Sequence, residues 1–513
     1  MAAQAENTEE WSSKAAFILA AIGSAVGLGN LWRFPYVAGE NGGGAFVVFY
    51  VICVLLIGLP VLVAELFIGR RGRLSAVGSV VRIARSEGRS PLWSMQAWLG
   101  MGGAFVILTF YSVIAGWVLA YVFMIGGDIL EGVASRGPAA LFAGAFAGET
   151  TDEVGAKLGA LLSDPTRMIV YHGVFLAVTV AIVSRGLKGG IEAAVTILMP
   201  AFFAMLSLLV VFSLATGDAL RGGDFLFGFR FADQVDENGD VVVRGFLAGL
   251  RDGSVISAAL GQAFFSIGLG SALMSTYGAH MSRDQDLPGS SRLVVLSDTA
   301  VGVLAGLAIF PIVFQVGLNP AGGPTLMFQT LPQAFQSMPA GGLFGLLFFV
   351  LAFFAAITSS IALLEAATAW FEERRPGRQR TSIAITLGGV AFVIGVANAL
   401  SQVPTTNPDG SARDLFFNTF RPWGAVPLFQ DGAGNPMELL SFLSALTDLI
   451  LPVAGFITAV FAGWIVSASV SREEIGFASE AWHRRWLFLI RYVCPVGIGM
   501  VIVYSFVIAP FLS

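Results

Sequence analysis

The sequence has 513 residues, of which 56% are hydrophobic and only 12% charged, and its mean hydropathy is +0.77. A composition this apolar excludes a water-soluble globular protein and indicates a polytopic membrane protein. The net charge of −5 gives no indication of nucleic-acid binding.

Apolar runs long enough to cross a bilayer, ~20 residues each, occur about eleven times along the chain. They fall near residues 15–37, 44–69, 96–126, 168–184, 191–215, 246–278, 290–317, 341–371, 382–400, 438–468 and 485–511. The sequence therefore predicts an all-α protein whose residues 1–513 form a single membrane domain. Residues 1–14 precede the first run.

The first run follows the acidic, polar segment 5–10, and no small-residue cleavage site closes it. These features predict a retained span rather than a signal peptide. Cys53 and Cys494 lie within apolar runs and form no Cys-x-x-Cys motif. We expect both thiols to fill space in the protein interior, and neither a metal site nor a disulfide.

The first span is interrupted by glycines and polar residues. Residues 23–35 read Gly-Ser-Ala-Val-Gly-Leu-Gly-Asn-Leu-Trp-Arg-Phe-Pro. In hydrocarbon a helix can unwind only where its freed N–H and C=O groups line a cavity or bind a ligand. Two half-helices would then direct their charged ends at one spot, which predicts an ion and substrate site near the bilayer midplane. Close helix packing on small residues is the alternative.

Positive charge predicts the orientation of the spans. The loop after the second span is rich in arginine, which places it in the cytoplasm. Counting spans from this loop puts the N-terminus inside and the C-terminus, residues 511–513, outside. The same count places four other groups of basic residues inside: Arg185/Lys188, Arg283/Arg292, Arg374/Arg375/Arg378/Arg380 and Arg484/Arg485.

Four long connections are predicted on the outer side, near 127–167, 217–245, 318–340 and 401–437. They are rich in Gly, Pro, Ala and Asp, as is typical of loops that cap a vestibule. Within the second, the segment 236–240 (Asp-Glu-Asn-Gly-Asp) separates two short apolar stretches. Asn-Gly favours a tight turn, so a small surface hairpin is expected there.

The sixth span repeats the anomaly of the first. Residues 261–271 read Gly-Gln-Ala-Phe-Phe-Ser-Ile-Gly-Leu-Gly-Ser, again with Gly-Leu-Gly in an apolar run. Two broken spans, five apart, are typical of an inverted repeat of five plus five helices. We expect residues 15–215 and 246–468 to form the two repeats, with a peripheral last helix at 485–511.

The eighth span carries three consecutive hydroxyl side chains, at residues 358–360. Hydroxyl and carbonyl oxygens can replace water around Na⁺. Hydrogen bonds to the preceding helical turn are the alternative use of such hydroxyls.

Several spans contain ionisable side chains, which are costly in a membrane and by default functional, and four of these residues lie near the broken helices or deep in a span. These residues are Arg33, Glu65, Asp298 and Asp448. Each alone could be a snorkelling or paired structural charge. Together with two broken helices they predict a coupled-ion pathway.

Four motifs, in order and across nearly the whole chain, resemble those of the neurotransmitter:sodium symporter family. They are residues 23–35, residues 40–46 (Glu-Asn-Gly-Gly-Gly-Ala-Phe), residues 264–266 (Phe-Phe-Ser) and residues 358–360 (Thr-Ser-Ser). The resemblance implies a LeuT-type fold and Na⁺-driven amino-acid uptake by alternating access across the cell membrane, the inner membrane in bacteria.

The resemblance also implies two sodium sites. The first would use the Ala25 carbonyl, Asn30, Ser266, Asp298 and the substrate carboxylate. The second would use carbonyls and hydroxyls of Gly23, Val26, Ala355, Thr358 and Ser359.

The substrate site implied by the same resemblance lies between the broken helices and two long spans. Its residues would be Ala25, Leu28, Gly29, Ile107, Tyr111, Phe265, Ser266, Gly268, Ser271, Ser359 and Leu363. Gly27 stands where monoamine carriers of the family have aspartate, so an amino acid is expected. Because Gly268 and Ser271 are small, the expected substrate has a bulky hydrophobic or aromatic side chain.

The gates depart from the family pattern. The arginine usual three residues before the N-terminal tryptophan is replaced by Thr8 before Trp11, although the expected inner acid, Glu373, is present. For the outer gate, Ser441 stands where the acid opposite Arg33 is usual, which leaves Glu438 as the expected substitute.

Chloride-dependent relatives bind the anion near positions that match Tyr50, Gln262, Ser266 and Gly302. Because Asp298 supplies a fixed carboxylate where relatives have asparagine, we expect transport without chloride. Proton counter-transport through this carboxylate remains open.

Other functions are also open to the sequence. The alternatives are a Na⁺-dependent carrier of another small zwitterion or amine, and a channel-like member of the fold. An enzyme is not expected, since His172, His280 and His483 are scattered and no phosphate-binding loop occurs. The expected partners are a small-molecule amino acid and membrane lipid, with the chain as a monomer or weak dimer.

Overall fold

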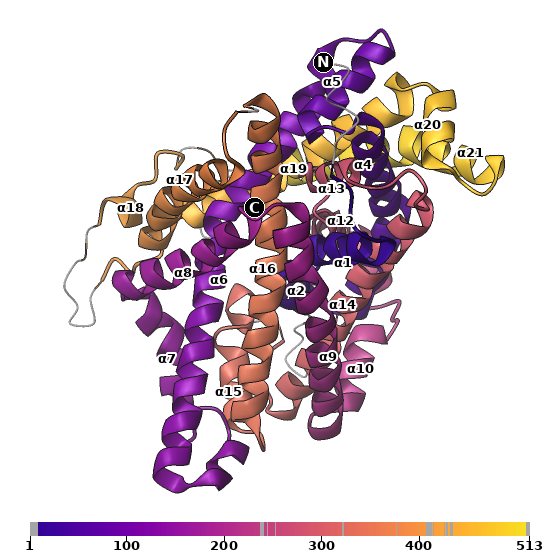
Figure 1. Cartoon of the computed structure of the whole chain (residues 1–513). Helices are drawn as coiled ribbons and strands as arrows, with labels where there is room; N and C mark the ends of the chain where they lie inside the picture. Colours follow the sequence, from indigo (N-terminus) through magenta and orange to yellow (C-terminus); the bar gives the residue numbers. More distant parts are fainter. Residues whose placement is uncertain are drawn as a thin grey trace.

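A computed structural model describes residues 9–235, 241–243, 245–251, 253–320, 323–375, 377–406, 415–424 and 434–508, together with residues 413, 426, 429 and 430. The described chain is helical except for one small hairpin (Figure 1).

The helices of the first half are α1 (Lys14–Ala25), α2 (Phe34–Glu40), α3 (Gly44–Cys53), α4 (Leu59–Gly72), α5 (Ala76–Ser86), α6 (Met95–Arg136), α7 (Thr151–Leu162), α8 (Pro165–Val183), α9 (Ala193–Thr216), α10 (Ala219–Phe227) and α11 (Phe246–Arg251). Those of the second half are α12 (Gly253–Ile267), α13 (Leu273–Ala279), α14 (Leu287–Gln315), α15 (Thr330–Gln336), α16 (Gly341–Arg374), α17 (Arg380–Ser401), α18 (Phe416–Thr419), α19 (Leu439–Val460), α20 (Ala468–Ile475), α21 (Glu480–Phe488) and α22 (Cys494–Val503).

Short π-helical segments continue several of these helices: Gly29–Arg33, Val54–Gly58, Leu187–Glu192, Phe461–Ile465, Leu489–Val493 and Tyr504–Ile508. Among the described residues, 3₁₀ turns lie at Pro91–Ser94, Pro138–Phe142 and Gly323–Leu326. The strands are β1 (Gln234–Val235) and β2 (Val241–Val243).

Ten of the eleven predicted spans are confirmed. Nine helices of the described chain are long and apolar enough to cross a membrane, and the bent pair α1/α2 supplies a tenth. The remaining predicted run, 246–278, contains α12 and α13, which are separated by a break. This chain is therefore a multi-pass membrane protein.

The first span is broken as predicted, but over fewer residues. Helix α1 ends at Ala25, Val26 is extended with ψ 111°, and the chain turns by 49° before helical structure resumes at Gly29. Pro35 lies at the start of α2, directly after the π-helical segment Gly29–Arg33, and the helix continues through it. The apparent breaker at 35 therefore lies in regular helix, and only residues 26–28 are unwound.

The sixth span is broken at residues 268–272. Gly268, Gly270 and Ala272 all adopt positive φ, at 71°, 74° and 63°. A side chain at Gly270 would place its Cβ 2.1 Å from the Leu451 carbonyl oxygen. Glycine is therefore needed here both for the backbone conformation and for the close approach of α19.

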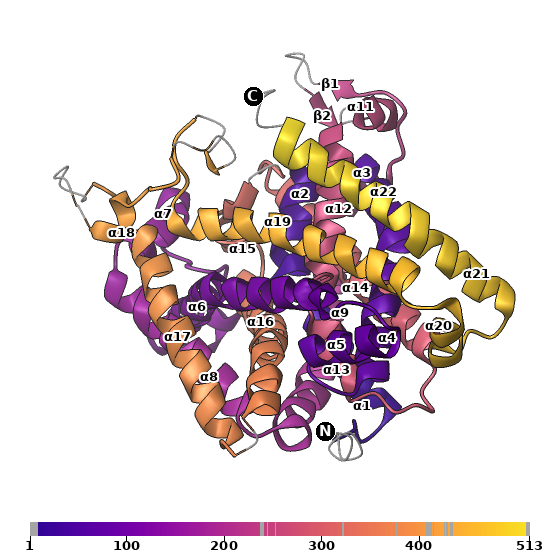
Figure 2. The ribbon, with the colours of Figure 1, turned by 90° about the horizontal axis from the view of Figure 1, so that it is seen from above.

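The two broken spans are enclosed by long helices. Helix α6 has 42 residues, so it extends ~63 Å, well beyond the hydrocarbon core. It packs along α16, where Tyr121 and Phe349 stack at 4.8 Å, and α1 packs against α9, α14 and α16. Figure 2 shows α6 crossing the middle of the molecule and α22 lying beside α19 at its edge.

The two ends of the molecule carry different short helices. Helices α5, α20 and α21 lie at the end that carries the N-terminus, whereas α7, α10 and α15 lie at the opposite end (Figure 1). The predicted outer connections therefore contain short helices. Strands β1 and β2 pair antiparallel, which confirms the hairpin, while its turn, 236–240, lies outside the described residues.

Candidate functional site

A small cavity lies where the two broken spans meet α6, α16 and α19. Its volume is about 50 Å³. The structure brings ten of the predicted substrate residues to its wall: Ala25, Leu28, Gly29, Ile107, Tyr111, Phe265, Gly268, Ser271, Ser359 and Leu363.

Four further residues complete the wall: Ser24, Gly27, Leu273 and Leu451. Leu273 is the first residue of the half-helix after the second break. Its position next to the break could have identified it as a wall residue from the sequence, but it was not predicted. Leu451 carries no such signal, because it is an ordinary apolar residue brought in by the packing of α19. The predicted residue Ser266 does not line the cavity and faces a separate polar cluster.

The cavity is closed and small in this conformation. A volume of 50 Å³ holds a few water molecules at about 10–15 Å³ each, whereas small-molecule sites span roughly 300–1,000 Å³. Any amino acid with a large side chain must therefore push the walls apart. Phe265, Ile107 and Leu363 are the apolar side chains that would move.

The unwound backbone provides the polar side of the cavity. The Leu28 N–H donates to the Tyr111 hydroxyl at 3.3 Å, and the Ser359 hydroxyl donates to the Val26 carbonyl at 3.3 Å. A Cβ at Gly27 would lie 2.4 Å from the Ser359 Oγ and 3.1 Å from the Tyr111 hydroxyl. Glycine at 27 is thus what lets α6 and α16 approach the first break.

A buried polar cluster lies on the far side of the first break. Asn30 donates from Nδ2 to the Ser266 hydroxyl at 2.9 Å and to the Asp298 carboxylate at 2.8 Å. The Ser266 hydroxyl donates to the other Asp298 oxygen at 2.6 Å, and Tyr50 donates to it at 3.3 Å. The side chains expected at the first sodium site therefore meet around one carboxylate, a hard oxygen ligand suited to Na⁺.

The residues expected at the second sodium site also come together. The Thr358 hydroxyl donates to the Ala355 carbonyl at 3.0 Å, and Ser359 reaches the Val26 carbonyl. A Cβ at Gly23 would lie 3.2 Å from the Thr358 Cβ, so α1 and α16 are in close contact here. Hydroxyl and carbonyl oxygens from two helices thus converge, as a desolvated monovalent cation requires. The hydrogen bond from Thr358 to Ala355 also fits the alternative use of these hydroxyls, which is bonding to the preceding turn of their own helix.

The side of the cavity that we expect to face outward, here called the outer side, is closed by an ion pair that corrects one prediction. Arg33 pairs with Asp448 at 3.1 Å, not with Glu438, and its guanidinium lies 4.5 Å above the Phe265 ring. Glu438 instead accepts a hydrogen bond from Ser441. Asp448 lies ten residues further along the chain, ~15 Å deeper along α19, which places it opposite the first break.

The opposite side, which we expect to face the cytoplasm and here call the inner side, is closed by the N-terminal segment. Trp11 is 4% exposed, packs edge-on against Tyr277 at 5.3 Å, and donates from its indole to the Tyr277 carbonyl at 3.1 Å. Its backbone N–H donates to the His280 carbonyl at 3.2 Å. Burial lowers the pKa of His280, so its neutral ring donates to the Glu9 carbonyl at 2.6 Å.

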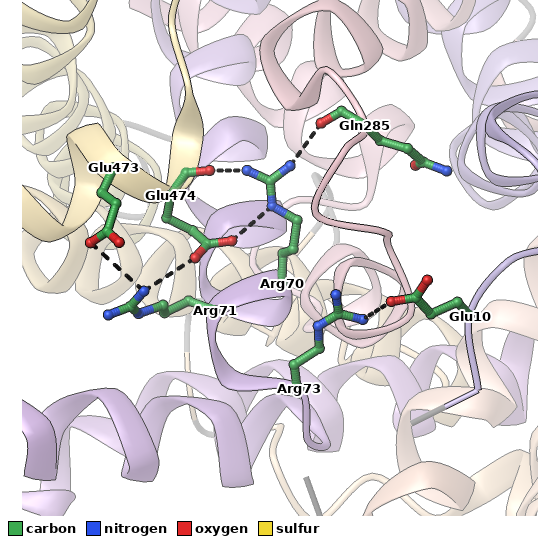
Figure 3. Close-up of polar contacts among 7 residues, drawn as sticks. All are labelled: Glu10, Arg70, Arg71, Arg73, Gln285, Glu473 and Glu474. Atoms are coloured by element: carbon green, nitrogen blue, oxygen red, sulfur yellow. Dashed lines mark hydrogen bonds and ion pairs between the residues drawn. The ribbon is translucent and has the colours of Figure 1, made fainter. Parts of the chain in front are cut away.

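The charges at the inner end also differ from the prediction. Glu373 accepts from the Ser75 N–H at 2.8 Å, at the start of α5, and this bond ties the end of α16 to that helix. The ion pair that fastens the N-terminal segment joins Glu10 to Arg73 at 2.8 Å (Figure 3). The acid is therefore on the N-terminal segment and the base on the first inner loop. Thr8 lies outside the described residues.

Glu65 links the second span to the second break. Its carboxylate accepts from the Gly270 N–H at 2.6 Å, and its carbonyl accepts from Ser275 at 3.1 Å. A buried carboxylate thus satisfies a backbone group that unwinding had freed. This explains one of the four ionisable residues noted in the spans.

Known proteins share this architecture. A model of the sodium:neurotransmitter symporter family matches residues 8–127 and 162–403. The chain is 32% identical to YhdH, an uncharacterized sodium-dependent transporter of Bacillus subtilis, over 96% of both chains. It is 25% identical to the sodium- and chloride-dependent neutral and basic amino acid transporter B(0+) of Mus musculus, over 76% of this chain and 67% of that one.

The crystal structure of MhsT in complex with L-phenylalanine is similar to this structure, with a TM-score of 0.77 and 35% sequence identity. The match covers 98% of this chain and 100% of MhsT. MhsT has the LeuT fold, so the predicted fold class is confirmed. The chain belongs to the sodium:neurotransmitter symporter family.

Proposed function

We propose that this protein is a sodium-coupled symporter that imports bulky hydrophobic or aromatic amino acids by alternating access. The observation that carries the proposal is the central cavity, which lies between two unwound spans and is flanked by two clusters of oxygen ligands. Unwound backbone is tolerated in a membrane only where it serves such a site.

The two oxygen clusters are the proposed sodium sites. Asp298, Ser266 and Asn30 would hold one cation together with the substrate carboxylate, and Thr358 and Ser359 with nearby carbonyls would hold the other. Both clusters touch the first break, so cations bound there would stabilise the backbone that faces the substrate. Sodium thereby favours the conformation that binds the amino acid, which is the coupling a symporter needs.

An amino acid fits the cavity better than a monoamine does. A side chain at position 27 would collide with Ser359 and Tyr111, so no acidic partner for an amine can stand there. The N–H groups at the first break instead suit a carboxylate. The phenylalanine complex of MhsT supports this choice of substrate class.

The proposed preference for large side chains is based on the size and apolar character of the residues that line the cavity. Gly268 and Ser271 add little volume, and Ile107, Phe265 and Leu363 are apolar. Each buried CH₂ of the substrate contributes ~0.8 kcal/mol, so a large side chain gains more from this surface than glycine or alanine would. The gain must exceed the cost of widening the closed cavity.

Chloride is not required under this proposal. The Asp298 carboxylate already lies against Tyr50 and Ser266, two of the positions associated with the anion in relatives. A second negative charge there would be repelled by the carboxylate.

We further propose that residues 15–215 and 246–468 are the inverted repeats and that the arginine-rich end is cytoplasmic. Five groups of basic residues agree with this orientation, as the positive-inside rule requires.

Uptake of labelled phenylalanine into proteoliposomes with an inward Na⁺ gradient tests the proposal. Saturable uptake should collapse when K⁺ replaces Na⁺ and persist when gluconate replaces chloride. Tryptophan and leucine should compete far better than glycine. Uptake that never saturates would indicate a channel, and equal competition by glycine would refute the size preference.

The Ser271→Phe variant tests the wall directly. Refilling the cavity should shift preference toward smaller amino acids by roughly tenfold or more, because about two methylenes' worth of volume is lost. Ser207→Phe on the exposed face of α9 is the matched control and should leave the preference unchanged.

A further inference from the structure

A second, larger cavity of about 620 Å³ lies at the end of the molecule that carries the N-terminus. Its walls come from α4 and the π-helical segment before it, the start of α14, and the chain from α20 through α21. It shares no residue with the central cavity, and the proposed transport function does not use it.

The cavity is apolar at one end. Leu55, Leu59, Val63 and Leu489 line this part, and Leu55 is 44% exposed on the surface of the second span. The apolar part therefore borders the surface that faces lipid. Trp482 lines the cavity near its other end and is 53% exposed. Because tryptophans are enriched at the membrane–water interface, this end should lie at the level of the lipid headgroups.

The polar end carries cations that are not neutralised locally. Arg283, Arg292 and Arg485 line it, all three are exposed, and none forms a salt bridge within the part of the chain that the structure describes. Arg485 lies 4.7 Å above the Trp482 ring.

The acidic residues of the same cavity are mostly engaged elsewhere. Glu474 pairs with Arg70 at 2.9 Å, and Glu473 and Glu474 both reach Arg71 (Figure 3). Asp286 caps α14 by accepting from the Gly289 N–H at 2.9 Å. Asp284 has no partner among the described residues and Asp286 pairs with no cation there, so three arginines face two carboxylates that no cation neutralises.

From this arrangement we infer that the cavity binds an anionic phospholipid, with its phosphate at the three arginines and an acyl chain along the leucines and Val63. Guanidinium groups bind phosphate through paired hydrogen bonds, and basic pockets between spans at the cytoplasmic surface suit acidic headgroups. A soluble anion would leave the apolar half of the cavity without a ligand.

The bound lipid would also fasten three separate parts of the chain together. Arg70 donates to the Gln285 carbonyl at 2.9 Å and holds both the side chain and the backbone carbonyl of Glu474, so this wall joins α4 to the α13–α14 loop and to α20. A ligand bound to this arrangement stabilises it by mass action.

Native mass spectrometry and thermal unfolding of the purified full-length protein in neutral detergent test the inference. Phosphatidylglycerol should bind at least tenfold more tightly than phosphatidylcholine of the same chains and should raise the unfolding temperature. The triple variant Arg283→Gln/Arg292→Gln/Arg485→Gln should lose this preference. The triple variant Arg374→Gln/Arg375→Gln/Arg378→Gln, with the same charge change on another inner loop, should keep it.

Two results would overturn the inference. One is a preference for phosphatidylglycerol that survives in the first triple variant. The other is displacement of the lipid by millimolar glycerol phosphate or inorganic phosphate, which would identify a site for a soluble anion. Both readouts are binding measurements, so they stand whether or not sodium-coupled uptake is found.

Discussion

The central cavity is closed by different means on its two sides. On the outer side, one ion pair, Arg33–Asp448, and one ring, Phe265, separate it from solvent. On the inner side, a buried tryptophan, three backbone and side-chain hydrogen bonds and the Glu10–Arg73 pair hold the N-terminal segment in place.

These closures differ in strength. The Asp448 side chain is 38% exposed, and ion pairs of this kind contribute about 0.2–1 kcal/mol. Truncating a buried tryptophan typically costs ~3–5 kcal/mol. The outer side should therefore open first and often, and the inner side only when the N-terminal segment is released. A carrier that loads from outside needs this order.

The largest effect is expected for Trp11→Ala. Losing the Tyr277 contacts should let the inner side open without substrate and reduce uptake by roughly 100-fold, the equivalent of ~3 kcal/mol. Proteoliposome uptake measures this. Trp98→Ala is the control, because Trp98 is 43% exposed at the lipid surface. Equal losses in both variants would mean that Trp11 has no special part in closure.

A smaller effect is expected for Asp448→Asn on the outer side. The variant loses the charge opposite Arg33, so substrate should leave outward more readily and uptake should fall about fivefold, the equivalent of ~1 kcal/mol. Substrate dissociation from the purified protein shows this most directly. Glu438→Gln should behave as wild type, and the opposite ranking of these two variants would restore Glu438 as the outer acid.

Pro200→Ala should slow the opening of the inner side without weakening substrate binding. Pro200 lies inside α9, which directly follows the π-helical segment that contains Gly190, and it removes a hydrogen bond within α9. Alanine should let α9 stay wound near the proposed second sodium site, which would lower turnover several-fold. Comparing the substrate Kd with the uptake rate tests this, and weaker binding at normal turnover would contradict it.

The smallest effect is expected for the Glu10–Arg73 pair. Arg73→Gln and Glu10→Gln should each change uptake by no more than about fivefold, because the Glu10 side chain is 45% exposed. The double variant should be no worse than either single one. Fully additive losses would show that the two charges act independently.

The sequence predicted the spans and both breaks because these depend on local composition. Glycines at 27, 29, 268 and 270 interrupt apolar runs, and a lipid environment allows few uses for such interruptions. Pro35, in the same stretch, does not interrupt the helix that runs from Gly29 to Glu40.

The gates were harder to predict because they depend on packing between distant segments. Asp448 was recognised as a buried charge, but its partner follows from how deeply α19 lies beside the first span, which no local pattern encodes. Leu451 was not predicted as a wall residue for the same reason, because its place in the wall depends on how α19 packs. The Glu10–Arg73 pair joins residues 63 positions apart, and the family pattern pointed to a different acid, Glu373.

Alternating access around the central cavity is most directly tested by labelling single cysteines on its two sides in a Cys53→Ala/Cys494→Ala background. Gly261→Cys probes the outer side, where a Cβ meets no atom within 4 Å, and Met274→Cys probes the inner side beneath Ser24 of α1. Na⁺ alone should raise labelling at 261 and lower it at 274, and adding phenylalanine should then lower labelling at 261. Labelling that rises and falls together at both positions, or that ignores Na⁺, would contradict sodium-coupled alternating access.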